Sequence, residues 1–205
     1  EVAIGTLSQN DALQLLAATA EAEEYVPADD GGSEDEQYRL ACEVVDLCGY
    51  LALTVSLAGG MISEADGLIE TDLVSVLRSE GVQNDEEDES VEDRVITASL
   101  KMIRKSKKSA ELTEQLMLFY AVFAEDVPIP TAILKTLAPS VLMHSSPSDK
   151  TGIATKQGLT TLLKFNLLKG GLAENAGTFM HDIVRDYVIS KHTVDELKAL
   201  QNQVV

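Results

Sequence analysis

The sequence contains no Trp, and aromatic residues make up only 4% of its 205 residues. Strands are usually enriched in aromatic and β-branched side chains, so this scarcity argues against a sheet-rich fold. Hydrophobic residues still make up 45% of the chain, which is enough for a buried core. Leu, Val, Ile and Ala must do most of the packing, and we therefore expect a mainly α fold in one large domain or two small ones.

Basic residues are also scarce, with 16 against 34 acidic residues and a formal net charge of −18. A nucleic-acid duplex repels such a chain unless a local basic patch overrides the field. The one dense basic run comprises Lys101, Arg104, Lys105, Lys107 and Lys108. This run is typical of the solvated C-terminal end of a helix, where cations interact favourably with the macrodipole. We expect no nucleic-acid partner.

The chain has only two cysteines, Cys42 and Cys48, which fall within one helical pattern. Six residues of helix rise by roughly 9 Å, too far for a disulfide, so we expect two reduced thiols. No apolar run reaches the ~18 residues that span a bilayer. The first residues also lack the basic start of a signal peptide. These features predict a cytoplasmic protein without membrane contact.

Several catalytic signatures are missing. There is no Gly-Lys-Ser or Gly-Lys-Thr, so no P-loop can hold phosphates, and no apolar strand ends in the acids that would hold magnesium. No nucleophile signature occurs, and the three histidines, His144, His181 and His192, show no metal-ligand spacing. We expect no catalytic residues, no metal site and no enzymatic activity from this chain on its own.

Residues 1–82 carry apolar positions at helical spacing and are predicted to form a small helical bundle. Ser8 and Asp11 resemble a capping box at the first helix. Gly49 is expected to interrupt the second helix, and Gly59-Gly60 to end the third. The expected helices cover residues 8–20, 34–48, 51–58 and 72–79.

Residues 83–93 contain seven acidic residues among eleven positions. Like charges in a row repel one another and bury nothing, so we expect a solvated linker. The segment lacks the central Gly and the spacing of an EF-hand loop, which argues against a calcium site.

Residues 94–205 change from helical to strand-like periodicity near their end. Helices are expected over residues 94–103, 112–120, 131–137 and 155–163, with Thr155 as a cap and Pro128 and Pro130 marking the entry to the third. A β-hairpin is expected from residues 166–172 and 178–181, and a last helix from Asp182. This order is that of a winged helix, so the predicted domains are the bundle, the linker and a winged-helix domain with a C-terminal helix.

Two segments, taken in order, resemble the NB-ARC family of P-loop switch proteins. Cys48-Gly-Tyr-Leu-Ala-Leu-Thr54 is similar to a conserved stretch of the family's first ARC subdomain, which is helical. Gly177-Thr-Phe-Met-His-Asp-Ile-Val-Arg-Asp-Tyr187 resembles the Met-His-Asp motif and following helix of the second, winged-helix ARC subdomain. The resemblance runs along nearly the whole chain and does not include the P-loop domain.

The resemblance implies that Leu51 and Ala52 lie near the nucleotide base. The family has Pro where this chain has Ala52, and Tyr50 and Thr54 also depart from its pattern. The alternative interpretation of the segment is a helix start that packs the bundle.

The second motif implies a phosphate contact. His181 is placed at a strand-to-helix junction, where an imidazole can donate a hydrogen bond to a phosphate oxygen or pair with it when protonated. The family's corresponding His contacts the β-phosphate of ADP. Asp182 is placed to cap the following helix. The alternative is a capped helix start with a packed His.

The resemblance implies the regulatory part of a nucleotide-dependent signalling switch, which closes over ADP or ATP bound mainly by an upstream P-loop domain. It also implies a downstream sensor or repeat domain and an oligomer on activation. The alternative is a winged-helix domain that binds DNA or another protein. The helix from Thr155 offers only Lys156 and Lys164 to DNA, with no Arg to bind guanine.

Overall fold

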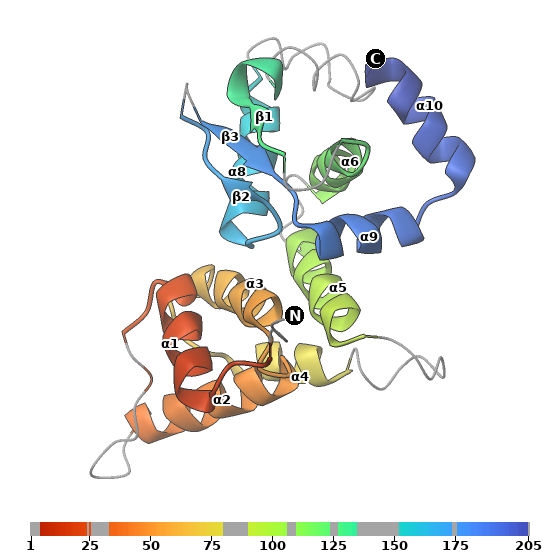
Figure 1. Cartoon of the computed structure of the whole chain (residues 1–205). Helices are drawn as coiled ribbons and strands as arrows, with labels where there is room; N and C mark the ends of the chain where they lie inside the picture. Colours follow the sequence, from red (N-terminus) through yellow and green to blue (C-terminus); the bar gives the residue numbers. More distant parts are fainter. Residues whose placement is uncertain are drawn as a thin grey trace. The chain divides into compact units, whose positions relative to one another are not determined.

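The computed structural model describes residues 5–23, 25, 33–79, 90–105, 110–123, 127–134, 152–173 and 176–204. It is mainly helical with one small antiparallel sheet, which confirms the predicted fold class. The chain forms two compact units, Glu1–Met102 (unit 1) and Ile103–Val205 (unit 2). Figure 1 shows the first four helices of unit 1 in red to yellow, the helix that contains the boundary in yellow-green, and the later elements in green to blue.

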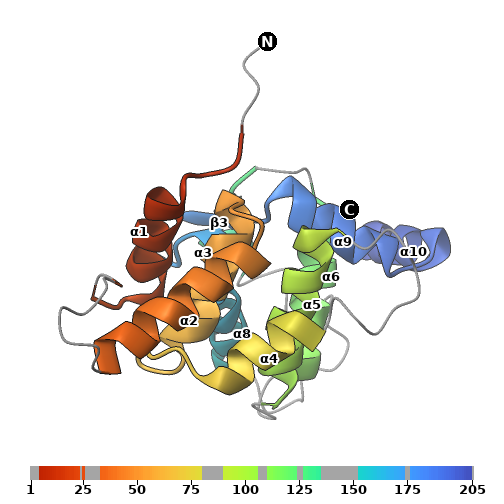
Figure 2. The same ribbon diagram turned by 90° about the horizontal axis from the view of Figure 1, so that it is seen from below.

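Unit 1 is a helical bundle, as predicted. Helix α1 packs against α2 and α3, and α2 also packs against α4; Figures 1 and 2 show α1 and α3 side by side. The Ser8 hydroxyl caps α1 by accepting from the Asp11 amide at 3.2 Å, which confirms the predicted cap. The helices are α1 (Gln9–Ala20), α2 (Ser33–Leu47), α3 (Ala52–Ser63), α4 (Thr71–Ser79) and α5 (Val91–Lys105).

Gly59 and Gly60 lie inside α3, so the prediction that they end this helix was wrong. A Cβ atom at Gly59 would lie 1.8 Å from Thr19 Oγ1 and 3.1 Å from the Thr19 backbone carbon. Glycine is therefore required by the close approach of α1 and α3, not by a helix end. The helix continues to Ser63 because both its faces are buried and the packing offsets the low helix propensity of Gly.

The two cysteines are free and differ in environment. Cys42 is half-buried, whereas Cys48 is fully buried and its Sγ lies 3.5 Å from the carbonyl oxygen of Thr54. Burial raises the pKa of the Cys48 thiol to about 12, although Arg94 and the Thr54 contact oppose this shift.

A thiol reagent at pH 8 is expected to modify Cys42 of the folded chain and to spare Cys48. The thiolate is the nucleophile, and raising a thiol pKa from 9.0 to about 12 lowers its thiolate fraction roughly 1000-fold. Mass spectrometry of Cys42→Ser, which retains only Cys48, measures the protected thiol alone. Equal labelling rates for the two thiols in the folded chain would contradict the buried position of Cys48.

Helix α5 links the units along the chain, and the boundary between them falls within it. The predicted linker spans residues 83–93, of which 83–89 lie outside the described residues. Residues 94–102 belong to unit 1, not to the winged-helix part as predicted. The physical reason is a long-range contact, because the Arg94 guanidinium donates to the Leu47 carbonyl oxygen at 2.5 Å.

In the part of unit 2 that the structure describes, a helix, a strand, two helical segments, two strands and two further helices follow one another, an order that includes that of a winged helix. The sheet order is β1-β3-β2, with Ile129 opposite Thr178 and Lys169 opposite Phe179. Helix α6 packs against α8 and α9. The elements are α6 (Ala110–Ala121), β1 (Ile129–Pro130), α8 (Ile153–Lys164), β2 (Lys169–Gly170), β3 (Gly177–Phe179), α9 (Asp182–Ser190) and α10 (Val194–Val204), and residues 131–134 are helical.

The observed hairpin, formed by β2 and β3, differs from the predicted one in two respects. Residues 166–168 are not strand, because Asn166 adopts a left-handed conformation and the Leu167 amide donates to the Leu162 carbonyl, which ends α8. A third strand, β1, pairs with β3 at the position where Pro128 and Pro130 predicted only a helix entry. Proline is compatible with an edge strand, where one missing donor is tolerated.

Two predictions about where helices start and end in unit 2 were wrong. The cap of α8 is Gly152, at φ +65°, while the predicted cap Thr155 is buried within the helix. The predicted last helix is two helices, α9 and α10, separated at Thr193. A reciprocal capping box starts α10, since the Thr193 amide donates to Glu196 Oε2 at 2.8 Å and the Glu196 amide to Thr193 Oγ1 at 3.3 Å.

Within the described residues, the structure contains no helix with both the length and the apolar character needed to cross a membrane.

Candidate functional site

His181 lies between strand β3 and helix α9, as the sequence predicts, and it is the N-cap residue of α9. Its backbone is extended, with φ −64° and ψ 144°. The preceding Met180 is buried, whereas the His181 side chain is 38% exposed. The imidazole is therefore held at the surface of unit 2 by a buried neighbour and by the start of a helix.

Asp182 is the first residue of α9, so the prediction that it caps the helix needs correction. The cap position belongs to His181, and Asp182 stabilises the first turn from within, because the Ile183 amide donates to its Oδ1 at 2.7 Å. A carboxylate in the first turn also interacts favourably with the helix dipole.

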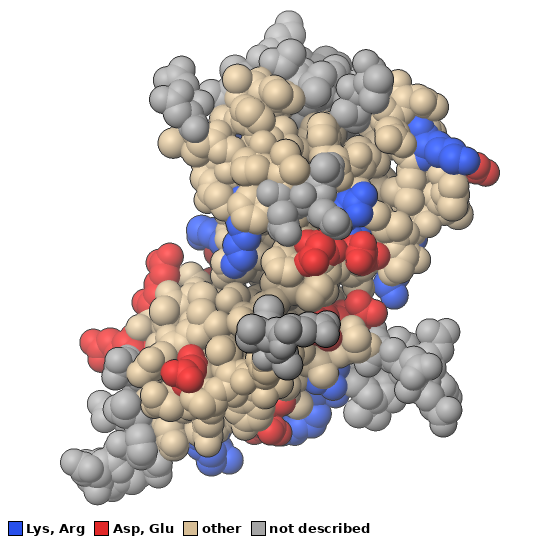
Figure 3. All heavy atoms as spheres, viewed as in Figure 1, with Lys and Arg blue, Asp and Glu red and all other residues tan. Residues whose placement is uncertain are grey.

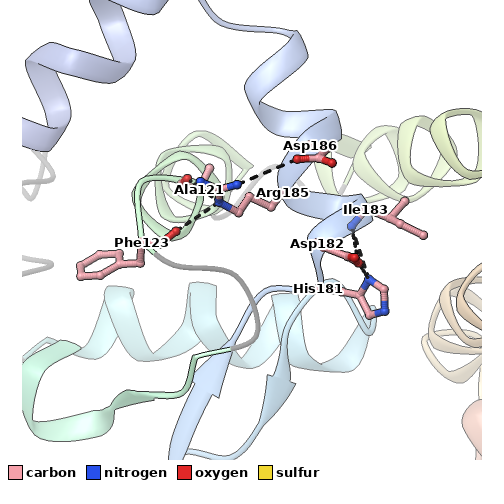
Figure 4. A network of polar contacts seen from close by, with 7 residues as sticks. All are labelled: Ala121, Phe123, His181, Asp182, Ile183, Arg185 and Asp186. Carbon is pink, nitrogen blue, oxygen red and sulfur yellow. Dashed lines mark hydrogen bonds and ion pairs between the residues drawn. The ribbon is translucent and has the colours of Figure 1, made fainter.

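The ring nitrogen Nδ1 of His181 has two neighbours, shown in Figure 4. It lies 3.4 Å from the Ile183 amide nitrogen and is in close contact with Asp182 Oδ1. Nδ1 accepts from the Ile183 amide, which also donates to Asp182 Oδ1 at 2.7 Å, so the ring and the carboxylate share one N–H donor. Figure 4 shows the other ring nitrogen, Nε2, pointing away from α9. The contacts of Nδ1 therefore hold the ring in place, and Nε2 remains on the side that faces away from α9.

Arg185 lies one turn further along α9 and reaches the end of α6. Its Nε donates to the carbonyl oxygens of Ala121 at 3.0 Å and Phe123 at 3.1 Å (Figure 4). The last carbonyls of a helix lack partners within the helix, and a nearby cation can satisfy them. The first turn of α9 is thereby joined to the C-terminal end of α6.

A second connection joins α6 to the strand before His181. The Tyr120 hydroxyl of α6 hydrogen-bonds the Thr178 hydroxyl of β3, and both residues are buried. Burial raises the pKa of Tyr120 to about 12, so its hydroxyl keeps its proton near neutral pH. No local sequence pattern marks Tyr120, Thr178 or Arg185 as functional residues, because only the tertiary structure brings them together.

Leu51 and Ala52 belong to unit 1, at the start of α3. Leu51 is the N-cap residue, half-buried and without a side-chain cap, and Ala52 is exposed. Two successive left-handed residues, Gly49 and Tyr50, precede them with φ of 61° and 56°. The corner is braced by Thr54 Oγ1, which donates to the Cys48 carbonyl at 2.6 Å. The segment is a rigid helix start with an accessible apolar edge.

Charge is divided unequally between the two units. Of the 16 basic and 34 acidic residues, 4 basic and 24 acidic ones lie in residues 1–102, and the other 12 basic and 10 acidic ones lie in residues 103–205. On the face shown in Figure 3, the described basic side chains are scattered and form no continuous stripe. Helix α8 exposes Lys156 and Lys164. An anion is repelled less strongly by unit 2 than by unit 1.

No protein-family model matches this chain, and neither does any curated protein. Among the described residues, no group of three or more His, Cys, Asp or Glu side chains is arranged to hold a metal ion.

Proposed function

We propose that this chain is the regulatory part of an NB-ARC type signalling switch, in which it closes over ADP or ATP held mainly by an upstream P-loop domain. The observation that carries the proposal is the fixed, partly exposed imidazole of His181 at the strand-to-helix junction. Its Nε2 is the contact for a nucleotide phosphate. In this proposal the chain is not an enzyme by itself, and a downstream sensor domain and oligomer formation belong to the activated parent protein.

The local chemistry supports the imidazole as the phosphate contact. Helix N-termini attract anions through free amides and the dipole, but at α9 the Ile183 amide is taken and the Asp182 carboxylate is itself negative. The helix start alone is therefore a poor anion site. Nδ1 faces the Ile183 amide and Asp182, and Nε2, when it carries a proton, donates directly to a phosphate oxygen.

The charge distribution supports a phosphate contact from unit 2. ADP is an anion, and unit 1, with its 24 acidic residues, repels it. In the proposal, the phosphate contact comes from His181 of unit 2, where acidic residues do not outnumber basic ones. Most of the affinity then comes from the P-loop domain, whose backbone amides and Lys suit phosphates.

Titration of this chain with ADP is expected to shift the imidazole NMR signals of His181 and to leave those of His192 unchanged. AMP is the matched ligand control, because it keeps the base and the sugar but lacks the β-phosphate. His192 is the matched residue control, since its Nδ1 also lies near a carboxylate, 3.8 Å from Glu196 Oε2. The signals are assigned with His181→Ala and His192→Ala.

Equal responses to ADP and AMP, or equal responses of His181 and His192, would remove the β-phosphate contact from the proposal.

A further inference from the structure

We infer that Arg185 is a positioning residue that holds His181 in place for the phosphate contact, with the Tyr120–Thr178 pair as the second anchor. The role in phosphate binding rests on the proposed function. The geometry of the two anchors stands without it.

Both anchors end at the C-terminal end of α6 or on the residues directly after it. Thr178 precedes His181 by three residues and contacts Tyr120, while Arg185 follows His181 by four residues and contacts the carbonyls of Ala121 and Phe123. The end of α6, together with the residues directly after it, therefore holds the chain on both sides of the imidazole. A segment held at two points on one rigid helix has little freedom to move its central residue.

The end of α6 is itself well supported. The Phe119 ring lies 5.9 Å from the Tyr120 ring in an edge-to-face arrangement and 5.0 Å from the Phe123 ring. Phe119 and Tyr120 are buried, and α6 also packs against α8. These aromatic contacts hold the carbonyl groups that accept from Arg185. Arg185 in turn holds the first turn of α9.

The guanidinium is suited to this contact. A single Nε–H shared between two carbonyl oxygens is directional, and Arg stays charged at every physiological pH. Arg185 Nη1 also lies 3.9 Å from Asp186 Oδ1, a longer contact on an exposed carboxylate. The carbonyl contacts, not the ion pair, therefore set the geometry.

Arg185→Met tests the inference, because Met keeps the apolar stem and removes every donor. The ADP-free NMR signals of the His181 imidazole are expected to move or broaden, and its response to ADP to become about tenfold weaker, similar to the loss of a supporting partner behind a metal ligand. Arg185→Lys, which keeps a donor, is expected to restore part of both. Arg104→Ala is the matched control, since Arg104 in unit 2 pairs with the exposed Glu114 carboxylate at 2.5 Å.

Unchanged His181 signals in folded, ADP-free Arg185→Met would overturn the inference, whatever ADP does. A second outcome would instead refute the proposed function: the His181 signals move or broaden in Arg185→Met as expected, but the unsubstituted chain shows no response to ADP. If Arg185→Met does not fold, Tyr120→Phe decides, because it removes the other anchor and keeps the ring. Unmoved His181 signals in that variant would also overturn the inference.

Discussion

In a longer polypeptide that joins this chain to the proposed P-loop domain, His181→Ala is expected to release ADP about 10- to 100-fold faster. Hydrogen bonds to charged groups contribute about 1.5–3 kcal/mol, and each 1.4 kcal/mol corresponds to a factor of ten in affinity. The loss appears mainly in the dissociation rate, because the P-loop domain still captures the nucleotide. Stopped-flow release of a fluorescent ADP analogue measures this rate.

The controls for that measurement come from the same unit. His192→Ala removes an imidazole that lies just beyond the C-terminal end of α9 and is expected to leave the rate unchanged. Asp182→Asn keeps the size of the side chain but weakens the support of Nδ1, so an intermediate rate is expected. An ADP dissociation rate that is the same in His181→Ala and in the unsubstituted protein would exclude His181 from nucleotide retention.

Gly59→Ala is expected to destabilise unit 1 by about 2–3 kcal/mol, the upper range for an added methyl group in a packed core. The new Cβ would lie 2.6 Å from Thr19 Cβ and 3.1 Å from the Thr19 backbone carbon, so a rotation of the Thr19 side chain cannot relieve the contact. Helices α1 and α3 must move apart, and the apolar contacts along their interface weaken.

Urea denaturation with labelling of Cys48 measures this loss, because Cys48 is buried in unit 1 and reports on that unit alone. Gly5→Ala is the matched control, since a Cβ there meets nothing within 4 Å. Thr19→Gly combined with Gly59→Ala removes the opposing Cβ and is expected to recover part of the stability despite the low helix propensity of Gly. A Gly59→Ala chain as stable as the original would show that α1 and α3 do not approach this closely.

Periodicity and capping chemistry predicted most helices of both units, because these signals are local. Helix α4, with Leu73, Val74 and Leu77 buried, occurs where the apolar spacing placed it. Helix α1 begins after its Ser8 cap, and His181 lies at the predicted junction. The pattern Thr193-Val-Asp-Glu196 is also a local capping signal, and it would have predicted the start of α10.

Other features could not be predicted, because they depend on residues that are distant in the sequence. The local sequence predicts that Gly59 ends a helix, and only the structure shows that Thr19 faces it. Strand β1 has only two residues, too few for any periodicity, and exists because β3 pairs with it. The sequence predicts only that Arg185 is a polar residue of an amphipathic helix. Its contact with the Ala121 carbonyl at the end of α6 is evident only from the structure.

The sequence by itself determined the helical character of the chain, the approximate limits of its helices, and the location of an imidazole at a helix start, since each depends on neighbours within one or two turns. The tertiary structure alone decided how that imidazole is held. Its anchors, Tyr120 and the carbonyls that Arg185 contacts, lie about sixty residues away along the chain, and only the packing of α6 against α9 brings them together.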